Sequence, residues 1–145
     1  MSASIPGGAD TDGTKEHVMR FSLVLAHPEP APGDVPEEAV AQMQDAFGHY
    51  GRALEESGVL IAAEVLVPTA SATTVTLRNG ALEVQDGPFA ETKDALAGIF
   101  VIDVPDLDAA LGWARQAPSA SYGHVEIRPG ATHFADGVWS GAPKL

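Results

Sequence analysis

The chain has 145 residues, enough for one domain with a real hydrophobic core and too few for two comfortable ones. Its 20 acidic and 8 basic residues give a net charge of −12. This charge repels phosphate backbones and anionic lipid, so we expect binding to neither nucleic acid nor membranes. The chain has no cysteine, which excludes disulfides, zinc–thiolate sites, iron–sulfur clusters and thiol nucleophiles.

Residues 1 to 17 are rich in small and polar side chains and contain only Ile5 as a large aliphatic residue. Such a segment cannot bury enough apolar surface to offset its ordering entropy, so we expect a disordered leader. It lacks the basic and apolar regions of a signal peptide, and no apolar run reaches transmembrane length. We therefore expect a cytoplasmic protein with one domain at residues 18 to 129, followed by an irregular C-terminal extension at residues 130 to 145.

Hydrophobic periodicity predicts the order strand, helix, strand, hairpin, strand, helix, strand. The predicted strands cover residues 18–26, 60–67, 99–104 and 124–128. The predicted helices cover residues 37–57 and 106–116, and the first has Asp34 as its cap and Gly58 as its stop. Asn79-Gly80 predicts a two-residue turn between hairpin strands at residues 73–77 and 81–85. This order is typical of a ferredoxin-like α+β fold with an inserted β-hairpin.

Alternation along the strands places several polar side chains on the sheet face away from the helices. They are Arg20 and Ser22 in the first strand, Glu64 in the second, and His124, Glu126 and Arg128 in the last. If this face is open to water, the sheet is half wetted, as in many antiparallel sheets. If a partner covers it, the same residues line an enclosed cavity.

Inside such a cavity, His124 is the natural acid–base group, because the pKa of histidine lies nearest neutrality. Glu64 or Asp86 could orient His124, or act as a base when desolvated. Arg20 or Arg128 could hold a carboxylate or enolate oxygen of a substrate. The alternatives are structural: His124 is then a half-exposed histidine at a strand start, and Glu64 forms a salt bridge to an arginine across the sheet.

His27 is a second candidate base, because it follows the first predicted strand beside a proline-rich loop. Strand ends often border pockets, although an ordinary loop histidine fits the same pattern. No pair of histidines has a spacing typical of a metal site, so we expect no bound metal. The chain also lacks a glycine-rich dinucleotide loop, a phosphate-binding loop and a nucleophile elbow, so we expect no cofactor.

The most informative stretch is Asp86-Gly87-Pro88-Phe89. Its first three residues are a strong turn signal, because Gly87 permits a positive φ and Pro88 fixes the next φ. Phe89 either fills a place in the core or lines a cleft with the polar residues that follow it. We therefore take Phe89, together with Ser22 on the sheet, as a candidate substrate contact.

This stretch resembles the signature of the YCII-related, or DGPF, family of small bacterial proteins. The resemblance continues in order through residues 58–60, 72–75, 102–108 and 125–129. It implies a homodimer in which two sheets pair to form an α+β barrel. For some members it also implies a His–Asp pair with the histidine in the first helix. The matching position here is Phe47, and the nearest histidine, His49, lies on another side of the helix, so that pair does not carry over.

Two functions fit these observations. The first is a cofactor-free lyase, isomerase or cyclase that moves protons on a small, partly apolar metabolite. Its basis is the resemblance, which implies a dehydrochlorinating activity in relatives and tailoring steps of secondary metabolism in similar barrels. The second is a non-catalytic regulator, because the resemblance implies a partnership with extracytoplasmic-function sigma factors, and an acidic surface suits a basic partner. A structural dimer with a cavity filled by side chains is the third alternative.

Overall fold

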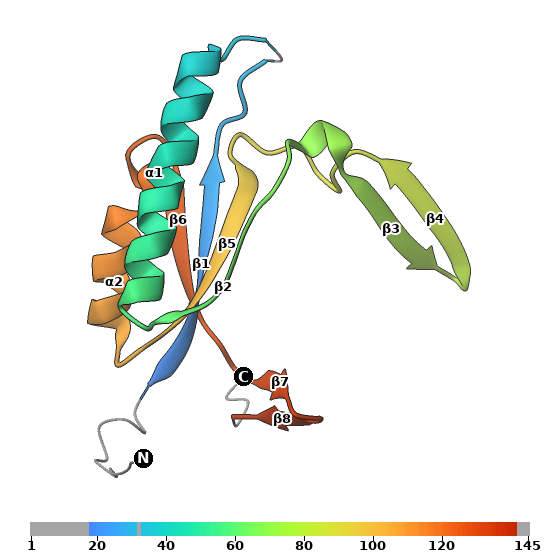
Figure 1. Ribbon diagram of the computed structural model, residues 1–145. Coiled ribbons are helices and arrows are strands. Elements are labelled where there is room, and N and C mark those ends of the chain that lie inside the picture. The colour runs from blue at the N-terminus through green and yellow to red at the C-terminus, as the bar shows by residue number, and fades with distance from the viewer. Residues whose placement is uncertain (1–17, 32, 142–145) are drawn as a thin grey trace.

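We describe the protein from a computed structural model, which describes residues 18–31 and 33–141. The predicted leader lies outside the described residues. The elements follow the predicted order (Figure 1): β1 (Met19–His27), α1 (Glu37–Glu56), β2 (Leu60–Val65), η3 (Thr69–Ser71), β3 (Thr73–Arg78), β4 (Ala81–Asp86), β5 (Ala95–Val104), α2 (Leu107–Gln116), η4 (Pro118–Ser121), β6 (His124–Pro129), β7 (His133–Ala135) and β8 (Val138–Ser140). The predicted α+β, ferredoxin-like class is confirmed.

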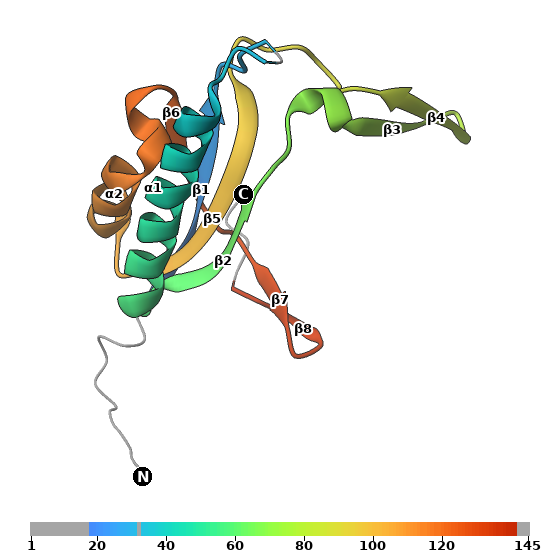
Figure 2. The same cartoon turned by 45° about the horizontal axis from the view of Figure 1, so that its top comes forward.

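The main sheet has four antiparallel strands in the order β2-β5-β1-β6. Both α-helices cover one face of this sheet, and the two views agree that no described helix covers the other face (Figures 1 and 2). Neither described helix combines the length and the hydropathy needed to cross a membrane.

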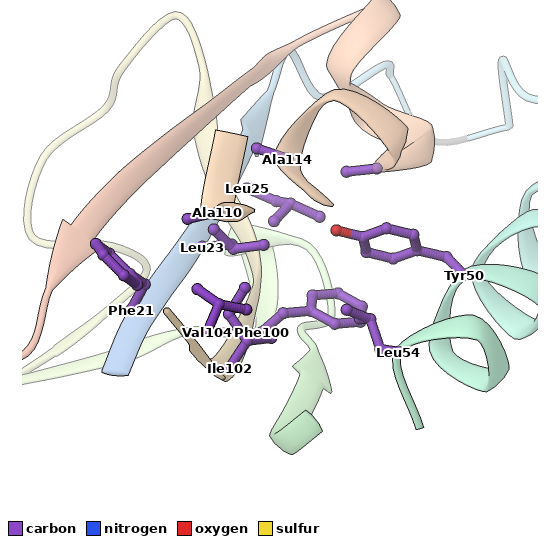
Figure 3. Packing of buried hydrophobic residues seen from close by; sticks show 11 residues of the cluster. Phe21, Leu23, Leu25, Tyr50, Leu54, Phe100, Ile102, Val104, Ala110 and Ala114 are labelled. Carbon is purple, nitrogen blue, oxygen red and sulfur yellow. The ribbon is translucent and has the colours of Figure 1, made fainter. Parts of the chain in front are cut away.

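The hydrophobic core lies between the sheet and the two α-helices (Figure 3). Its buried members are Phe21, Leu23 and Leu25 of β1, Phe100, Ile102 and Val104 of β5, Tyr50 and Leu54 of α1, Ala110 and Ala114 of α2, and Ala117 directly after α2. Every second residue of β1 from Phe21 to Leu25 faces the helices, as the predicted alternation requires, and the same holds for β5 from Gly98 to Val104, after a register shift near its start. The remaining side chains of these strands are left on the helix-free face.

The two α-helices begin differently. Asp106 caps α2, because its carboxylate accepts a hydrogen bond from the backbone N–H of Ala109 at 2.9 Å. The prediction that Asp34 caps α1 is wrong: the capping residue is Pro36, and no side chain caps this end. Asp34 lies two residues earlier, in a turn closed by its own N–H and the carbonyl of Ala31. Gly58 ends α1 with a φ of 74°, as predicted.

The predicted hairpin is present and stands away from the main sheet (Figures 1 and 2). We call β3 and β4 together the arm. Its turn residues, Asn79 and Gly80, have φ angles of 52° and 79°, which is the geometry that a two-residue hairpin turn requires. The arm is continuous with the DGPF stretch, which leads back from the end of β4 to the start of β5.

Residues 130 to 145 are predicted to be irregular, but β7 and β8 form a short hairpin within them. Asp136 and Gly137 make its turn with φ angles of 54° and 82°. Asp-Gly is a hairpin signal of the same kind as Asn-Gly, and the sequence prediction overlooks it. Phe134 and Trp139 pack edge to face across the strands, with ring centroids 5.3 Å apart. Both hairpins lie to the helix-free side of the main sheet (Figure 2).

Candidate functional site

The candidate site is the helix-free face of the main sheet, which we call the open face. Strand register and alternation assign to it Arg20, Ser22, Val24 and Ala26 of β1, Ala62 and Glu64 of β2, Leu96, Ile99, Val101 and Asp103 of β5, and His124, Glu126 and Arg128 of β6. The polar members are those predicted from the sequence, apart from Asp103. The larger apolar members, Val24, Ile99 and Val101, lie on the two central strands, between Glu64 on β2 and the polar residues of β6.

A histidine–aspartate pair lies at one end of the open face. Nδ1 of His124 is hydrogen-bonded to a carboxylate oxygen of Asp94. The side chain of His124 is 79% exposed, whereas that of Asp94 is only 20% exposed. Because an ionised carboxylate can only accept, Nδ1 carries the hydrogen of this bond. Nε2 is then the ring nitrogen left for proton exchange with a ligand.

Three strand ends meet to build this pair. In β1, Ala26 pairs with His124 of β6, and His27 pairs with Ala95 of β5, the residue directly after Asp94. Gly123 makes the approach of β6 to β1 close, because a Cβ at this position would overlap the carbonyl oxygen of Ala26 and the Cβ of His27. Glycine is therefore required directly before His124.

The structure corrects the expectation that Glu64 or Asp86 orients His124, since Asp94 occupies that place. Glu64 is on β2, and β2 and β6 are the two outer strands of the sheet. Three inter-strand spacings separate them, or about 14 Å, which is too far for contact. Asp86 ends β4 at the base of the arm, with its side chain exposed.

Glu64 lines a shallow, largely apolar hollow on the β2 side of the open face. The hollow has a volume of about 220 Å³ and is lined by Ala62, Ala63, Glu64, Ile99 and Val101. Within the described part of the chain, Glu64 forms no salt bridge to an arginine. The alternative in which Glu64 pairs with an arginine across the sheet is therefore wrong. Its carboxylate lies beside the apolar side chains of the hollow.

Arg20 is at the other end of the open face, where it makes a bidentate salt bridge to Asp103. The two bonds, from Nε and Nη2, are 2.9 and 3.0 Å long. The hydrogen bonds and charge of Asp103 raise the pKa of Arg20 above its usual value. This pair lines a pocket of about 390 Å³, to which His133 and Ser140 contribute from β7 and β8. Arg20 can hold an anion only by sharing or leaving Asp103.

The other predicted arginine, Arg128, is exposed and forms a 3.1 Å salt bridge to Glu126, its neighbour on β6. Ser22 lies between Arg128 and Val101 in the sheet register, so it belongs to the open face as predicted. Exposed pairs of the Arg128–Glu126 kind contribute little to stability. The side chains of Arg128 and Glu126 can therefore rearrange around a ligand at little cost in stability.

His27 is near His124 in the sheet but belongs to its other face. It follows Ala26, which pairs with His124, so alternation turns it toward the helix side. Its ring packs edge to face on Tyr122, with centroids 5.5 Å apart, and its Nδ1 lies 2.9 Å from the carbonyl oxygen of Pro28. This placement gives His27 a packing role and separates it from the open face.

The DGPF stretch forms the base of the arm. Gly87 has a φ of 96°, its N–H donates to the carbonyl of Ala72 at 2.7 Å, and its carbonyl accepts from Oγ1 of Thr74 at 2.8 Å. Gly87 thus adopts the positive φ that the sequence predicts, and the chain bends there while it stays bonded to the start of β3. Phe89 is 81% exposed, so it does not fill a place in the core.

Asp94 is the site residue that sequence reasoning missed. It follows the polar run after Phe89, where many exposed side chains are expected. Its role depends on β5 starting at Ala95, four residues before the predicted start. In the described part of the chain, no group of three or more His, Asp or Glu residues is placed to hold a metal ion.

Comparison with known proteins places these features in a family. The YCII-related domain matches residues 19–130 of the chain. A Rhizobium meliloti (strain 1021) protein named only as uncharacterized is 46% identical over 76 residues, which are 51% of this chain and 61% of the relative. The chain thus spans about three fifths of the relative that it matches. Because the domain match covers the main sheet, both α-helices and the arm, the chain belongs to the YCII-related family.

Proposed function

We propose that the protein is a cofactor-independent enzyme, a lyase, isomerase or cyclase, that transfers protons on a small, partly apolar metabolite bound to the open face. The observation that carries this proposal is the hydrogen bond between His124 and Asp94. His124 is the acid–base group, and Asp94 is the positioning residue that fixes its tautomer.

The pair has the features that general acid–base catalysis needs. A largely buried carboxylate at Nδ1 holds the imidazole ring in one orientation and stabilises the imidazolium formed when Nε2 takes a proton. The exposed ring leaves Nε2 within reach of a ligand. A positioned group of this kind contributes about 10²–10⁴-fold to the rate of a proton transfer.

The middle of the open face supports a small, partly apolar substrate. Val24 of β1 pairs with Ile99 of β5 on one side and with Glu126 of β6 on the other. Glu126 is two residues after His124 and lies on the same face. A ligand lying along this apolar stretch can reach His124 at one end. Glu64, on the far side of the face, offers a second carboxylate for a hydroxyl or ammonium group of a larger substrate.

The proposal also includes a homodimer, because the open face of one chain needs a cover that excludes water. In a single chain the open face is accessible to water, which weakens the electrostatic interactions of a bound substrate and quenches reactive intermediates. A second copy that covers the face turns it into an enclosed site. The alternative role, binding a basic protein such as a sigma factor, is supported by the net charge of −12 and does not require the His124–Asp94 pair.

Solvent-deuterium exchange tests the proposal even while the natural substrate is unidentified. Ligand-observed NMR with a panel of small aromatic and alicyclic keto and hydroxy acids identifies binders, and each binder is then incubated with the protein in D₂O. We expect deuterium to enter the acidic C–H position of a binder. His124→Gln should slow this exchange by about 100-fold or more, because the acid–base group is lost.

Two further variants sharpen this test. Asp94→Asn should slow exchange while binding persists, because the amide no longer fixes the imidazole tautomer that carries its hydrogen on Nδ1. His49→Gln is the matched control, since His49 lies on the exposed side of α1, and its exchange rate should equal that of the unchanged protein. Equal rates for the His124 and His49 variants would remove His124 from the mechanism.

A further inference from the structure

The pocket beside Arg20 lies at the end of the open face opposite His124. Arg20 precedes Ala26, the residue that pairs with His124, by six positions of β1, or about 20 Å of extended strand. A small ligand held beside Arg20 is therefore out of reach of Nε2 of His124. The proton transfer proposed above makes no use of this pocket, so we consider its chemistry separately.

The C-terminal hairpin, β7 and β8, forms one wall of this pocket and lies near the start of β1 (Figure 1). The family domain matched in this chain ends at residue 130, so the hairpin lies outside that domain. His133 and Ser140 pair across the two strands, which places both side chains on the same face of the hairpin, and both line the pocket. Phe134 and Trp139 lie on the opposite face. The hairpin thus turns its polar pair, and not its aromatic pair, toward Arg20.

This wall is fixed by backbone contacts at its base. The N–H of Gly130 donates to the carbonyl of Arg20 at 2.8 Å, which ties the segment before β7 to β1. Gly141, directly after β8, has a φ of 90°, and a Cβ at this position would lie 3.0 Å from the carbonyl oxygen of Ala131. Glycine meets both the conformation and the limited space there. The two ends of the hairpin are therefore held close together, beside β1.

The Arg20–Asp103 salt bridge presents both of its charges to the pocket. Both residues line the pocket, and their side chains are 27% and 26% exposed. Asp103 accepts from Nε and Nη2 of Arg20, which are only two of the five N–H donors of a guanidinium. A carboxylate has about four acceptor sites, so Asp103 also keeps part of its capacity. The salt bridge can therefore stay intact while each of its partners bonds to a ligand.

This arrangement selects a ligand that carries a positive and a negative group. A bare anion that meets Arg20 is repelled by Asp103, and a bare cation that meets Asp103 is repelled by Arg20. An amino acid avoids both repulsions, because its carboxylate accepts from Arg20 while its ammonium group donates to Asp103. Its lack of net charge also suits a protein of net charge −12, whose field disfavours anions.

We propose that the pocket beside Arg20 is a binding site for a small α-amino acid in its zwitterionic form. Arg20 and Asp103 hold the two charged groups, and His133 and Ser140 offer further N–H and O–H donors to the carboxylate. The proposal does not rest on the proposed function, since it involves neither His124 nor proton transfer.

The size and remaining lining of the pocket fit this ligand. Its volume of about 390 Å³ lies within the range of small-molecule sites, toward the lower end. Val18 and Ala131 add apolar surface to the lining, which suits a short aliphatic side chain. The ligand is therefore an amino acid with an apolar side chain, rather than one with a second charged group.

Chemical-shift titration of the isotope-labelled full chain tests the ligand class. Three probes share an unbranched apolar chain: norvaline carries both charged groups, pentanoate lacks the amine, and butylamine lacks the carboxylate. We expect norvaline to shift the amide signals of residues 130–133, 140 and 141. It should bind about tenfold more tightly than either other probe, because it forms one more charge-assisted hydrogen bond. No shift with norvaline, shifts confined to other residues, or equal affinity for pentanoate or butylamine would overturn the proposal.

Asp103→Asn gives a result that a loss of folding cannot produce. The variant keeps Arg20 and the shape of the side chain but loses the negative charge, so it should bind pentanoate more tightly than norvaline, the reverse of the unchanged protein. The control Asp45→Asn makes the same change at an exposed position of α1 and should keep the preference for norvaline. An unaltered preference in Asp103→Asn would show that Asp103 does not hold the ammonium group, and would overturn the proposal.

The hairpin wall provides a second variant that spares the salt bridge and the core. His133→Gln with Ser140→Ala should weaken norvaline binding by about threefold to tenfold, because hydrogen bonds to the carboxylate are lost. Unchanged norvaline binding in this variant would contradict the place assigned to the hairpin in the site.

Discussion

His124 takes its chemistry from neighbours that lie far from it in the sequence. Asp94, which holds its Nδ1, is 30 positions earlier, and Ala26, which pairs with its backbone, is on the first strand. The histidine alone could be chosen from the sequence because the alternation of β6 places it on the helix-free face. Its partner could not, because the position of Asp94 depends on where β5 begins.

Gly123 is the residue whose replacement most directly disturbs this pair. Gly123→Ala should destabilise the fold by about 1–3 kcal/mol, because the added methyl overlaps the backbone of β1. The start of β6 must then shift, which separates His124 from Asp94. Urea unfolding measures the loss, and the exchange assay measures the effect on the site.

Gly112→Ala is the matched control, since a Cβ at this position in α2 meets no atom within 4 Å. Alanine suits a helix interior better than glycine, so this variant should be unchanged or more stable by about 0.5–1 kcal/mol. If Gly123→Ala proved as harmless as Gly112→Ala, close packing would not be what fixes the start of β6.

Tyr50 gives the fold a pH dependence at the alkaline end. Its hydroxyl donates to the carbonyl of Trp113 at 2.7 Å, and burial raises its pKa from 10.0 to about 12. Between these values the unfolded chain ionises while the folded chain stays neutral. Stability from this group is therefore complete below pH 10 and is lost as the pH rises toward 12.

Tyr50→Phe isolates this effect. At pH 8 the variant should be less stable by about 1 kcal/mol, because the carbonyl of Trp113 loses its donor. From pH 10 to 12 the stability of the variant relative to the unchanged protein should rise by about 1–2 kcal/mol, since phenylalanine does not ionise. Denaturant titrations at several pH values give both quantities. A constant difference over this range would contradict the assignment of the alkaline loss to Tyr50.

At the scale of elements, periodicity is sufficient where one face of a strand or helix is buried. The alternation of β1 and β6 separates core from open face correctly, and Asn79-Gly80 marks the arm. Hydrophobic periodicity does not predict where a strand begins when pairing with a distant strand determines that end. β5 begins at Ala95 because that residue pairs with His27, although the stretch that follows it is rich in alanine and glycine.

Local turn chemistry explains the other differences. Asp136-Gly137 is a hairpin signal that lies among residues with no apolar periodicity, so periodicity alone predicts irregular chain where β7 and β8 form. Phe89 is a candidate for the core on sequence grounds because large aromatic side chains are usually buried. It lies outside the core because Gly87 and Pro88 turn the chain at the base of the arm.

At the scale of the whole molecule, the apolar surface is distributed unevenly. α1 and α2 cover one face of the sheet, whereas both hairpins lie on the other side (Figure 2) and carry exposed large apolar side chains, among them Leu77, Leu82 and Trp139. Such surfaces mark sites of association or ligand binding in soluble proteins. The homodimer and the substrate site that we propose use the same side of the molecule, so each makes the other possible.

The central claim is that His124, held by Asp94, acts on a ligand bound to the open face. A crystal structure of the protein with a binder from the NMR screen tests it most directly. We predict that the reactive carbon or oxygen of the ligand lies within about 3.2 Å of Nε2 of His124, with its apolar part against Val24 and Ile99. A ligand bound only in the pocket beside Arg20, or an open face filled by side chains with no room for a ligand, would contradict the account.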